Sequence, residues 1–330
     1  MKNSITDIPG IKVGHAQNEE AITGCTVVLT EAGAVAGVDQ RGGGPGTRET
    51  DLLKPENSVS KVHAIMLSGG SAFGLDSASG VVRFLEEKGI GYDVGIAKVP
   101  IVPAAILFDL NIGNANIRPD AEMGYQACLM ANNSPPEQGS VGAGMGATVG
   151  KLLGMGQAVK GGVGTASIDI GNGVKVGALI AVNALGDVID PEKGKIIAGA
   201  RTLKKGPIKI GNQELFANSL TVLQSRIVQG MMTLSSRQNT VIGVVATNAA
   251  LTKAQATKVA QMAQNGVVRA IRPANTLHDG DTIFCLSTGK KKADVNVVGA
   301  FAAQAVAQAI LNGVREATRM GGIPSISDLV

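Results

Sequence analysis

Short apolar runs separated by polar turn residues dominate the first third of the chain. Residues 26–29 and 34–38 predict two neighbouring strands, and the uniformly apolar residues 63–67 are typical of a buried strand. The third run leads through a Ser-Gly-Gly-Ser segment into a helical pattern, whose apolar face carries Leu75, Ala78, Val81, Val82 and Leu85. Gly89 is expected to end this helix.

The second half of the chain shows the same alternation of strands and helices. Strands are expected near residues 174–182 and 219–224, and another begins directly after the polar segment that ends at Asn239. Residues 201–216 are basic and polar, which predicts that this segment is an exposed hairpin or insertion.

Two amphipathic helices are predicted near the carboxyl end. The first begins at the N-cap Thr252, runs to about Gln264 and stops at Gly266, with an apolar stripe made by Ala256, Val259, Ala260 and Ala263. The second covers residues 296–319 and is ended by the pair Gly321-Gly322.

The composition favours small side chains packed in layers. The chain has 330 residues, of which 44% are hydrophobic, with 45 glycines, 6 phenylalanines, 2 tyrosines and no tryptophan. A core so poor in aromatic side chains must consist of Ala, Val, Ile and Leu, which suits sheets packed closely against helices. Because no Pro- or Ser-rich linker and no clean repeat divides the chain, we expect a single α/β domain over residues 1–330.

Charge and cysteine content exclude several classes of partner. The net charge of +4 is too mild to indicate a nucleic-acid partner, and the aromatic side chains that would stack on bases are scarce. The three cysteines are scattered in apolar surroundings, so we expect buried, reduced thiols (Cys25, Cys128 and Cys285). The three histidines show no metal-ligand spacing (His15, His63 and His278), so no metal is expected.

The amino-terminal segment lacks the apolar region of a secretion signal. No run of about 18 apolar residues suggests a membrane span. We therefore expect a cytoplasmic protein that does not enter a membrane.

Two glycine-rich loops, residues 41–51 and 139–150, raise the question of a nucleotide site. A P-loop requires a glycine five residues before its Gly-Lys pair and a Ser or Thr after it. Here Met145 stands at the first place and Leu152 at the second, and no Rossmann spacing follows a predicted strand. We therefore expect these loops to make tight turns or to shape a pocket, and we expect no cofactor.

A polar segment from Ser235 to Asn239 runs straight into a β-branched strand that begins at Thr240. If the chain is cut between Asn239 and Thr240, the threonine gains a free α-amine beside its hydroxyl, and the two provide a nucleophile and its base. An Asn-Thr pair before a strand is more often only a turn. The junction leaves both interpretations open, and other segments must decide between them.

Three further segments carry polar side chains that would complete such a site. Asp279 and Asp281 flank a glycine before an apolar strand, as an ordinary turn or as two carboxylates that orient the new amine and tune its pKa. Lys160 is either a solvated lysine or a group that holds developing negative charge. Asn183, at a strand end, is either a turn former or an oxyanion donor.

Together these segments resemble the family of self-processing aminopeptidases/D-esterases, which also contains the 6-aminohexanoate-oligomer (nylon-oligomer) hydrolases. The resemblance runs nearly from end to end of the chain. It is carried by residues 8–15, 41–51, 67–76, 102–110 and 141–151 and by the Asn239-Thr240 junction.

The resemblance implies a four-layer αββα sandwich, similar to the N-terminal-nucleophile hydrolases but with different connectivity. It implies that the chain cuts itself into an α chain, residues 1–239, and a β chain, residues 240–330. Thr240 is then the nucleophile, its amine is the base, and Asn183 is the oxyanion donor.

The resemblance favours the nylon-oligomer branch of this family. Lys160 matches the lysine of that branch, and Asp279 and Asp281 match its two carboxylates. Aminopeptidases of the family commonly have serine as nucleophile and a different polar pair at these two positions. Tyr125 is matched with a substrate-pocket tyrosine, the alternative being a place in the core.

The sequence thus predicts a cofactor-free, self-activating amidase that acts on small amides or oligoamides through an acyl-enzyme on Thr240. Two other functions stay open. One is an acyltransferase, since ornithine acetyltransferases use a related fold and a similar self-cleaved threonine, and the other is a binding protein with a glycine-rich pocket. The resemblance also implies a homo-oligomer, a tetramer of αβ units.

Overall fold

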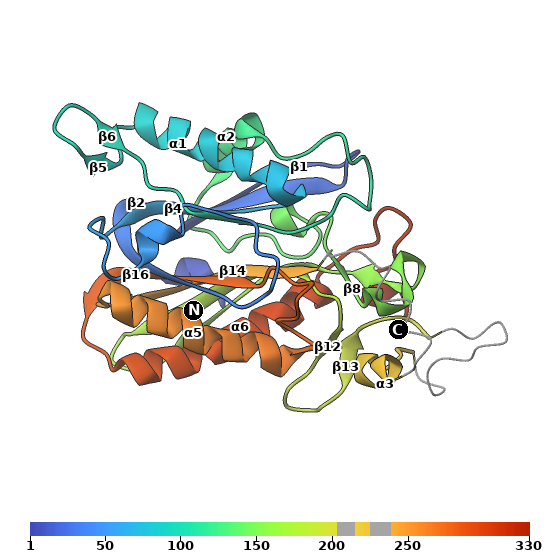
Figure 1. The fold of residues 1–330 in the computed structure, drawn as a ribbon. Helices are drawn as coiled ribbons and strands as arrows, with labels where there is room; N and C mark the ends of the chain where they lie inside the picture. Colours follow the sequence, from blue (N-terminus) through green and yellow to red (C-terminus); the bar gives the residue numbers. More distant parts are fainter. Residues whose placement is uncertain (203–214, 225–238) are drawn as a thin grey trace.

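The computed structural model describes residues 1–202, 215–224 and 239–330. Two sheets face each other, and a pair of helices covers the outer side of each, which gives four layers (Figure 1). This α/β sandwich confirms the predicted αββα fold class.

The elements follow in two groups. The sheet beside the first helix pair contains β1 (Lys12–Asn18), the first part of β2 (Thr23–Gln40), β4 (Val62–Ser68), β7 (Ala104–Ile106) and β3 (Thr47–Arg48). The sheet beside the second helix pair contains β10 (Gly162–Asp169), β11 (Lys175–Asn183), β14 (Thr240–Ala249), β16 (Thr282–Lys291) and the last part of β2. The helix pairs are α1 (Ser77–Glu87) with α2 (Ala121–Met130), and α5 (Lys253–Ala270) with α6 (Val295–Arg315).

The remaining elements of the fold are short. The short strands are β5 (Tyr92–Asp93), β6 (Lys98–Val99), β8 (Thr148–Val149), β9 (Val159–Lys160), β12 (Asp187–Ile189), β13 (Ile196–Ala198) and β15 (Ile271–Arg272), and the short α-helix is α3 (Ser219–Leu223). Short 3₁₀ helices cover Ile5–Asp7, Asp51–Leu53, Ser71–Asp76, Gly142–Gly144, Lys151–Leu153, Met155–Gln157 and Ile326–Asp328.

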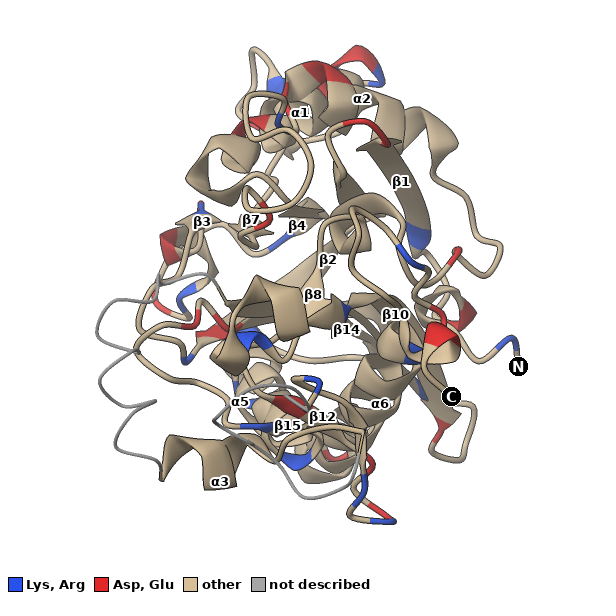
Figure 2. Ribbon diagram, turned by 90° about the vertical axis from the view of Figure 1, so that its right-hand side faces the viewer, with Lys and Arg blue, Asp and Glu red and all other residues tan. Residues whose placement is uncertain are grey.

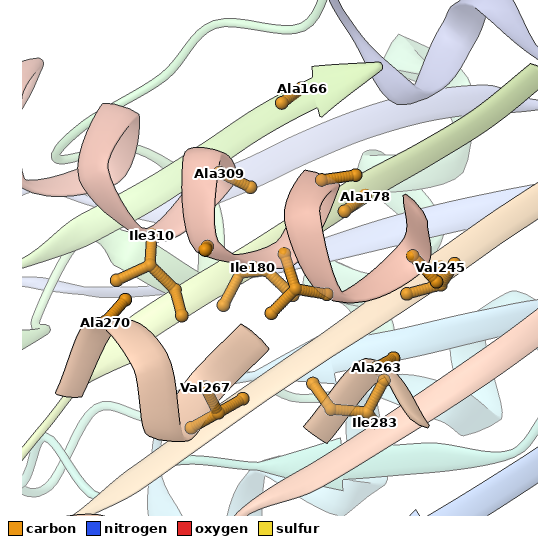
Figure 3. Close-up of a cluster of buried hydrophobic side chains, with 14 of the residues drawn as sticks. Ala166, Ala178, Ile180, Val245, Ala263, Val267, Ala270, Ile283, Ala309 and Ile310 are labelled. Atoms are coloured by element: carbon orange, nitrogen blue, oxygen red, sulfur yellow. The ribbon is translucent and has the colours of Figure 1, made fainter. Parts of the chain in front are cut away.

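The interfaces between layers are filled by small apolar side chains. On β11, Leu179 and Ala181 face the other sheet while Ile180 faces the helices, as the alternation of a strand requires. Figure 3 shows the helix side, where Val267 of α5 and Ile310 of α6 lie over the strands. Small side chains at these positions let the layers approach closely, which agrees with the aromatic-poor composition.

The two strands predicted over residues 26–29 and 34–38 are one long strand, β2. Its register shifts between Leu29 and Ala34, where Gly33 adopts a left-handed φ of +77°. The chain bulges there instead of turning back. The first part of β2 therefore pairs with β1 and β4, its last part pairs with β16, and β2 joins the two sheets.

The strand predicted near residues 219–224 is wrong, because this segment contains helix α3. The Asn218 side chain accepts hydrogen bonds from the N–H groups of Leu220 (3.0 Å) and Thr221 (3.2 Å). This N-cap favours a helical turn in a segment whose apolar, β-branched residues had indicated a strand.

Helix α5 extends beyond Gly266, its predicted end, to Ala270. A Cβ on Gly266 would lie 2.2 Å from the carbonyl oxygen of Ala303 in α6. The glycine is therefore needed for close helix packing rather than for termination. Helix α6 ends earlier than the predicted 296–319, at Arg315.

Helix α6 is, among the described residues, the one that is long and apolar enough to cross a membrane. Its apolar side chains, including Ala302, Val306 and Ile310, are buried against the sheet and α5, as in the core helix of a globular fold. Figure 2 shows acidic and basic residues interspersed over the side that it displays. The hairpin or insertion predicted at 201–216 falls largely on residues 203–214, which lie outside the described residues.

The three cysteines are buried and free, as the sequence predicted.

Candidate active site

Thr240 is the first residue of β14, between β11 on one side and β16 on the other. Its side chain is almost fully buried, with 5% exposed. The Thr240 hydroxyl donates a short hydrogen bond to the carbonyl oxygen of Asn239, so that the hydroxyl lies against the peptide group that precedes it.

The loop before β16 brings both predicted carboxylates to this junction. Asp281 accepts hydrogen bonds from the N–H of Val241 (2.7 Å) and the N–H of Asn275 (2.9 Å). Asp279 accepts one from the N–H of Thr276 (2.6 Å), and its backbone pairs with that of Asn239. The two aspartates therefore form more than a solvated turn, since both are buried beside the Asn239-Thr240 peptide.

Burial dominates the protonation of this pair. The pKa of Asp281 is raised to about 7, first by burial and then by the charge of Asp279, although two backbone N–H groups oppose the shift. Burial also raises the pKa of Asp279. A carboxyl group that titrates near neutral pH can exchange protons during catalysis.

The described residues contain no group of three or more His, Cys, Asp or Glu side chains arranged as metal ligands.

The first glycine-rich loop holds the aspartate loop in place. The N–H of Gly44 donates to the Asp279 carbonyl oxygen (2.8 Å), and the N–H of Arg41 donates to that of Asp281 (2.9 Å). A Cβ on Gly42 would lie 2.2 Å from the Asp279 carbonyl oxygen, so only glycine permits this approach. The loop therefore supports the aspartate loop through its backbone.

Asn183, the last residue of β11, is paired directly with Thr240 across the two strands. Its Oδ1 accepts from the Lys151 ammonium (2.7 Å) and from the N–H of Thr148 (3.0 Å), and its Nδ2 donates to the Phe108 carbonyl oxygen (2.9 Å). Since the backbone N–H and the ammonium can only donate, these partners fix the amide with its oxygen toward them. Its N–H₂ group is thereby oriented to donate.

Lys151 is the residue of this site that sequence reasoning missed. Its Nζ donates to both the side-chain oxygen and the carbonyl oxygen of Asn183, at 2.7 and 3.0 Å. Burial lowers the pKa of Lys151 to about 7, although the charges of Asp279 and Asp281 oppose the shift. The available signal was its place at the end of the second glycine-rich loop, which the sequence analysis tested only as a phosphate-binding loop.

Lys160 lies deeper than Lys151. Its side chain is fully buried, and its Nζ donates to the Met145 carbonyl oxygen at 2.6 Å. Burial lowers the pKa of Lys160 to about 7, opposed by the charge of the buried Asp109. Lys160 thus contacts the loop that carries Thr148, and the N–H of Thr148 in turn donates to Asn183. Lys160 is therefore connected to Asn183 through this loop and not by a direct contact.

Tyr125 is not brought together with these residues. It lies half-buried on α2 in the outer helical layer, where its hydroxyl donates to Glu87 (2.7 Å). Its ring packs edge-on against Phe84 and under the guanidinium of Arg83. These contacts agree with the packing alternative, and its role in substrate binding stays a prediction.

Comparison with known proteins shows which family and which relatives the chain matches. The model of Peptidase family S58 matches residues 3–326. An uncharacterized aminopeptidase of Mycobacterium tuberculosis is 42% identical over 99% of this chain and 98% of its own, and one of Mycobacterium leprae is 43% identical over 98% and 93%. A 6-aminohexanoate-oligomer endohydrolase of Kocuria sp. is 29% identical over 94% of this chain and 85% of its own.

The solved structures agree in fold. A β-aminopeptidase of Burkholderia sp. superposes with a TM-score of 0.69 at 20% identity, over 99% of this chain and 91% of its own. The L-aminopeptidase D-Ala-esterase/amidase of Ochrobactrum anthropi, described as a variant of the Ntn hydrolase fold, gives 0.70 at 19% identity over 98% and 88%.

Fold and relatives define a peptidase or amide hydrolase built on an Ntn-type sandwich. The chain belongs to Peptidase family S58. The resemblance to this family is confirmed. The predicted preference for its nylon-oligomer branch is not, because the relatives named aminopeptidases share more identity with this chain than the nylon-oligomer endohydrolases do.

Proposed function

We propose that this protein is a self-processing amide hydrolase that cuts its own chain between Asn239 and Thr240. The observation that carries the proposal is the contact of the Thr240 hydroxyl with the Asn239 carbonyl group, beside two buried carboxylates. A hydroxyl held against the preceding carbonyl is the starting arrangement for an attack on that peptide bond.

In maturation, Thr240 Oγ1 attacks the carbonyl carbon of Asn239. A carboxylate of the Asp279–Asp281 pair takes the hydroxyl proton and passes it to the Thr240 nitrogen as the C–N bond breaks. The resulting ester is hydrolysed by water, which leaves a carboxylate on Asn239 and a free amine on Thr240. The raised pKa of Asp281, about 7, supports this role because such a group both takes and returns a proton near neutral pH.

In turnover, the new amine of Thr240 acts as the base for its own hydroxyl. The hydroxyl attacks the substrate amide, and the N–H₂ group of Asn183, held by Lys151, stabilises the oxyanion. Lys160 supports the loop behind Asn183. An acyl-enzyme forms on Thr240, the amine product leaves, and water releases the acid. The chain itself supplies nucleophile, base and oxyanion donor.

The substrate class is a small amide. Relatives of higher identity are named aminopeptidases, and more distant ones are named 6-aminohexanoate-oligomer endohydrolases. An amide bond is common to both kinds of substrate, so short peptides and oligoamides are the candidates. We also propose that the enzyme works in the cytoplasm as a homo-oligomer of αβ units, which light scattering of the cut protein would test.

The intact mass of the purified protein under denaturing conditions tests maturation. Two fragments, residues 1–239 and 240–330, are expected, and a single inactive 33.5 kDa chain would contradict the proposal. The cut protein is then incubated with aminoacyl anilides and with 6-aminohexanoate oligomers. Release of free acid supports the hydrolase, whereas transfer of the acyl group to added ornithine would favour an acyltransferase.

A further inference from the structure

Among the residues that the structure describes, two donate hydrogen bonds to the carbonyl oxygen of Asn239. One is the Thr240 hydroxyl, and the other is the backbone N–H of Gly280, at 3.1 Å. If the Thr240 hydroxyl gives up its proton as it attacks, only the second of these donors remains to face the negative charge that develops on the oxygen. The position of Gly280 therefore matters for the chemistry at this bond.

Gly280 is held rigidly in this position. The neighbouring Asp279 pairs its backbone with Asn239 and accepts a hydrogen bond from the N–H of Gly44 (2.8 Å). A Cβ on Gly280 would lie 2.9 Å from the Gly44 carbonyl oxygen and 3.0 Å from Thr240 Oγ1. Only glycine lets the backbone approach the nucleophile so closely without a shift, and a donor fixed in advance is what stabilises an oxyanion.

Asn183 and Gly280 flank Thr240 from opposite sides of β14. Asn183 belongs to β11, whereas Gly280 lies in the loop that leads into β16. The Asn239 carbonyl oxygen accepts the hydrogen bond from the Gly280 N–H on the β16 side of β14. The donor for the chain's own carbonyl group and the donor proposed for a substrate thus lie on opposite sides of β14.

We propose that the backbone N–H of Gly280 is the oxyanion donor for self-cleavage, distinct from the Asn183 side chain that serves turnover. This inference rests on the proposed function. As the bond between Thr240 Oγ1 and the Asn239 carbon forms, the carbonyl π electrons move to the oxygen and Gly280 N–H stabilises them. They return when the C–N bond breaks, with the proton passing from the aspartate pair to the Thr240 nitrogen.

The test replaces the Gly280 amide by an ester, using glycolic acid at codon 280 in cell-free translation of the full chain. The ester lacks the N–H and keeps the shape of the backbone. The matched control is the same replacement at Gly89, which removes a backbone hydrogen bond to the Glu86 carbonyl oxygen (2.8 Å) at the end of α1, away from the Asn239 carbonyl group. The appearance of residues 240–330 is followed by mass spectrometry.

Loss of one oxyanion donor slows a reaction by about 10²–10³-fold, so the Gly280 ester should cleave that much more slowly, and the Gly89 ester should cleave nearly as fast as the unmodified chain. Equal rates for the two esters would overturn the inference. An unmodified chain that never cleaves would instead overturn the proposed function itself.

A second pair of variants does not depend on the ester. Gly280→Ala forces a Cβ against the backbone of Gly44 and against Thr240, whereas a Cβ on Gly44 meets its nearest atom, the Asp279 carbonyl oxygen, at 3.8 Å. Gly280→Ala should therefore cleave at least tenfold more slowly than Gly44→Ala. Equal cleavage rates would also overturn the inference, because the N–H of residue 280 cannot keep its place beside a new side chain.

Discussion

Asn183 and Thr240 form a cross-strand pair at the ends of β11 and β14. Thr240 shares a face with Ile242, and Asn183 shares a face with Ala181, and both faces point between the two sheets. Their side chains therefore lie side by side in the space between the sheets. A shift of one residue in this register would turn one side chain toward the helices, so the pairing of the strands fixes the proposed donor beside the proposed nucleophile.

From this pairing we predict that Asn183→Ala lowers kcat by about 10²–10³-fold, with a smaller change in KM, because the lost N–H₂ group acts mainly in the transition state. Steady-state kinetics of the cut enzyme on its best amide substrate measure this. Asn248→Ala is the control, since Asn248 is a buried asparagine at the other end of β14 that bonds Lys175 N–H and the Gly173 carbonyl oxygen. A similar loss of kcat in the control would point to a general effect on the sheet.

Thr240→Ala should leave one uncut chain without amidase activity, because neither a hydroxyl nucleophile nor a new amine is available. Thr240→Ser keeps both groups and should still be cut and active. Intact mass and an amide-hydrolysis assay on the two variants check this. A Thr240→Ala protein that is processed and active would disprove the assignment of the nucleophile.

The sequence pointed to several polar residues of the site because each stands at the end of an apolar run. Asn183 ends one strand, Thr240 begins another, and Asp281 precedes a third. Spacing could not show that these ends meet. Their meeting depends on the sheet order β11-β14-β16, which requires long-range pairings that no local pattern encodes. The likeness to a known family, not the spacing, indicated that these residues belong to one site.

Other features depend on long-range contacts that the pattern of apolar residues along the chain does not encode. Lys151 reaches Asn183 because the loop from Met145 folds back over the end of β11, and its place in the sequence indicated at most a phosphate site. The packing of Gly266 against α6 is equally invisible along one helix. Tyr125 shows the converse, since a match in sequence did not bring its side chain to the site residues.

Asp281→Asn should slow self-cleavage by about 10²-fold and change its dependence on pH. In the unchanged chain the cleavage rate should rise with pH and level off above about 7, as the raised pKa of Asp281 requires, with Asp279 and Lys151 as its charged neighbours. In the variant, Asp279 loses the repulsion of its neighbour and ionises at lower pH, so the inflection should move to lower pH. Cleavage rates of freshly translated protein between pH 5 and 9 measure this, and an unaltered profile would exclude the aspartate pair as the proton acceptor.

Gly266→Ala should destabilise the protein by about 1–3 kcal/mol, because its Cβ would press into the Ala303 carbonyl group of α6. Gly156→Ala is the control, since a Cβ there meets nothing within 4 Å. Thermal or urea unfolding compares the two. If the two variants are equally stable, α5 and α6 can move apart without a loss of stability, which would contradict the close packing of the two helices at Gly266.

The buried ammonium of Lys160 should make stability depend on pH. Burial lowers its pKa from the ordinary lysine value of 10.5 to about 7 in the folded chain. Between these values the unfolded chain binds a proton that the folded chain lacks, so stability rises with pH by up to about 1.4 kcal/mol per unit, and this contribution levels off below about 7. Lys160→Met removes this rise.

The measurement compares Lys160→Met with its parent, both as uncut Thr240→Ala chains, by urea unfolding between pH 6 and 10. The stability of the parent relative to the variant should increase as the pH rises above 7. Lys151 is present in both chains, so its titration cancels in the difference except for the part of its lowered pKa that the charge of Lys160 causes. A difference that stays flat over this range would show that the Lys160 ammonium keeps its proton in the folded chain.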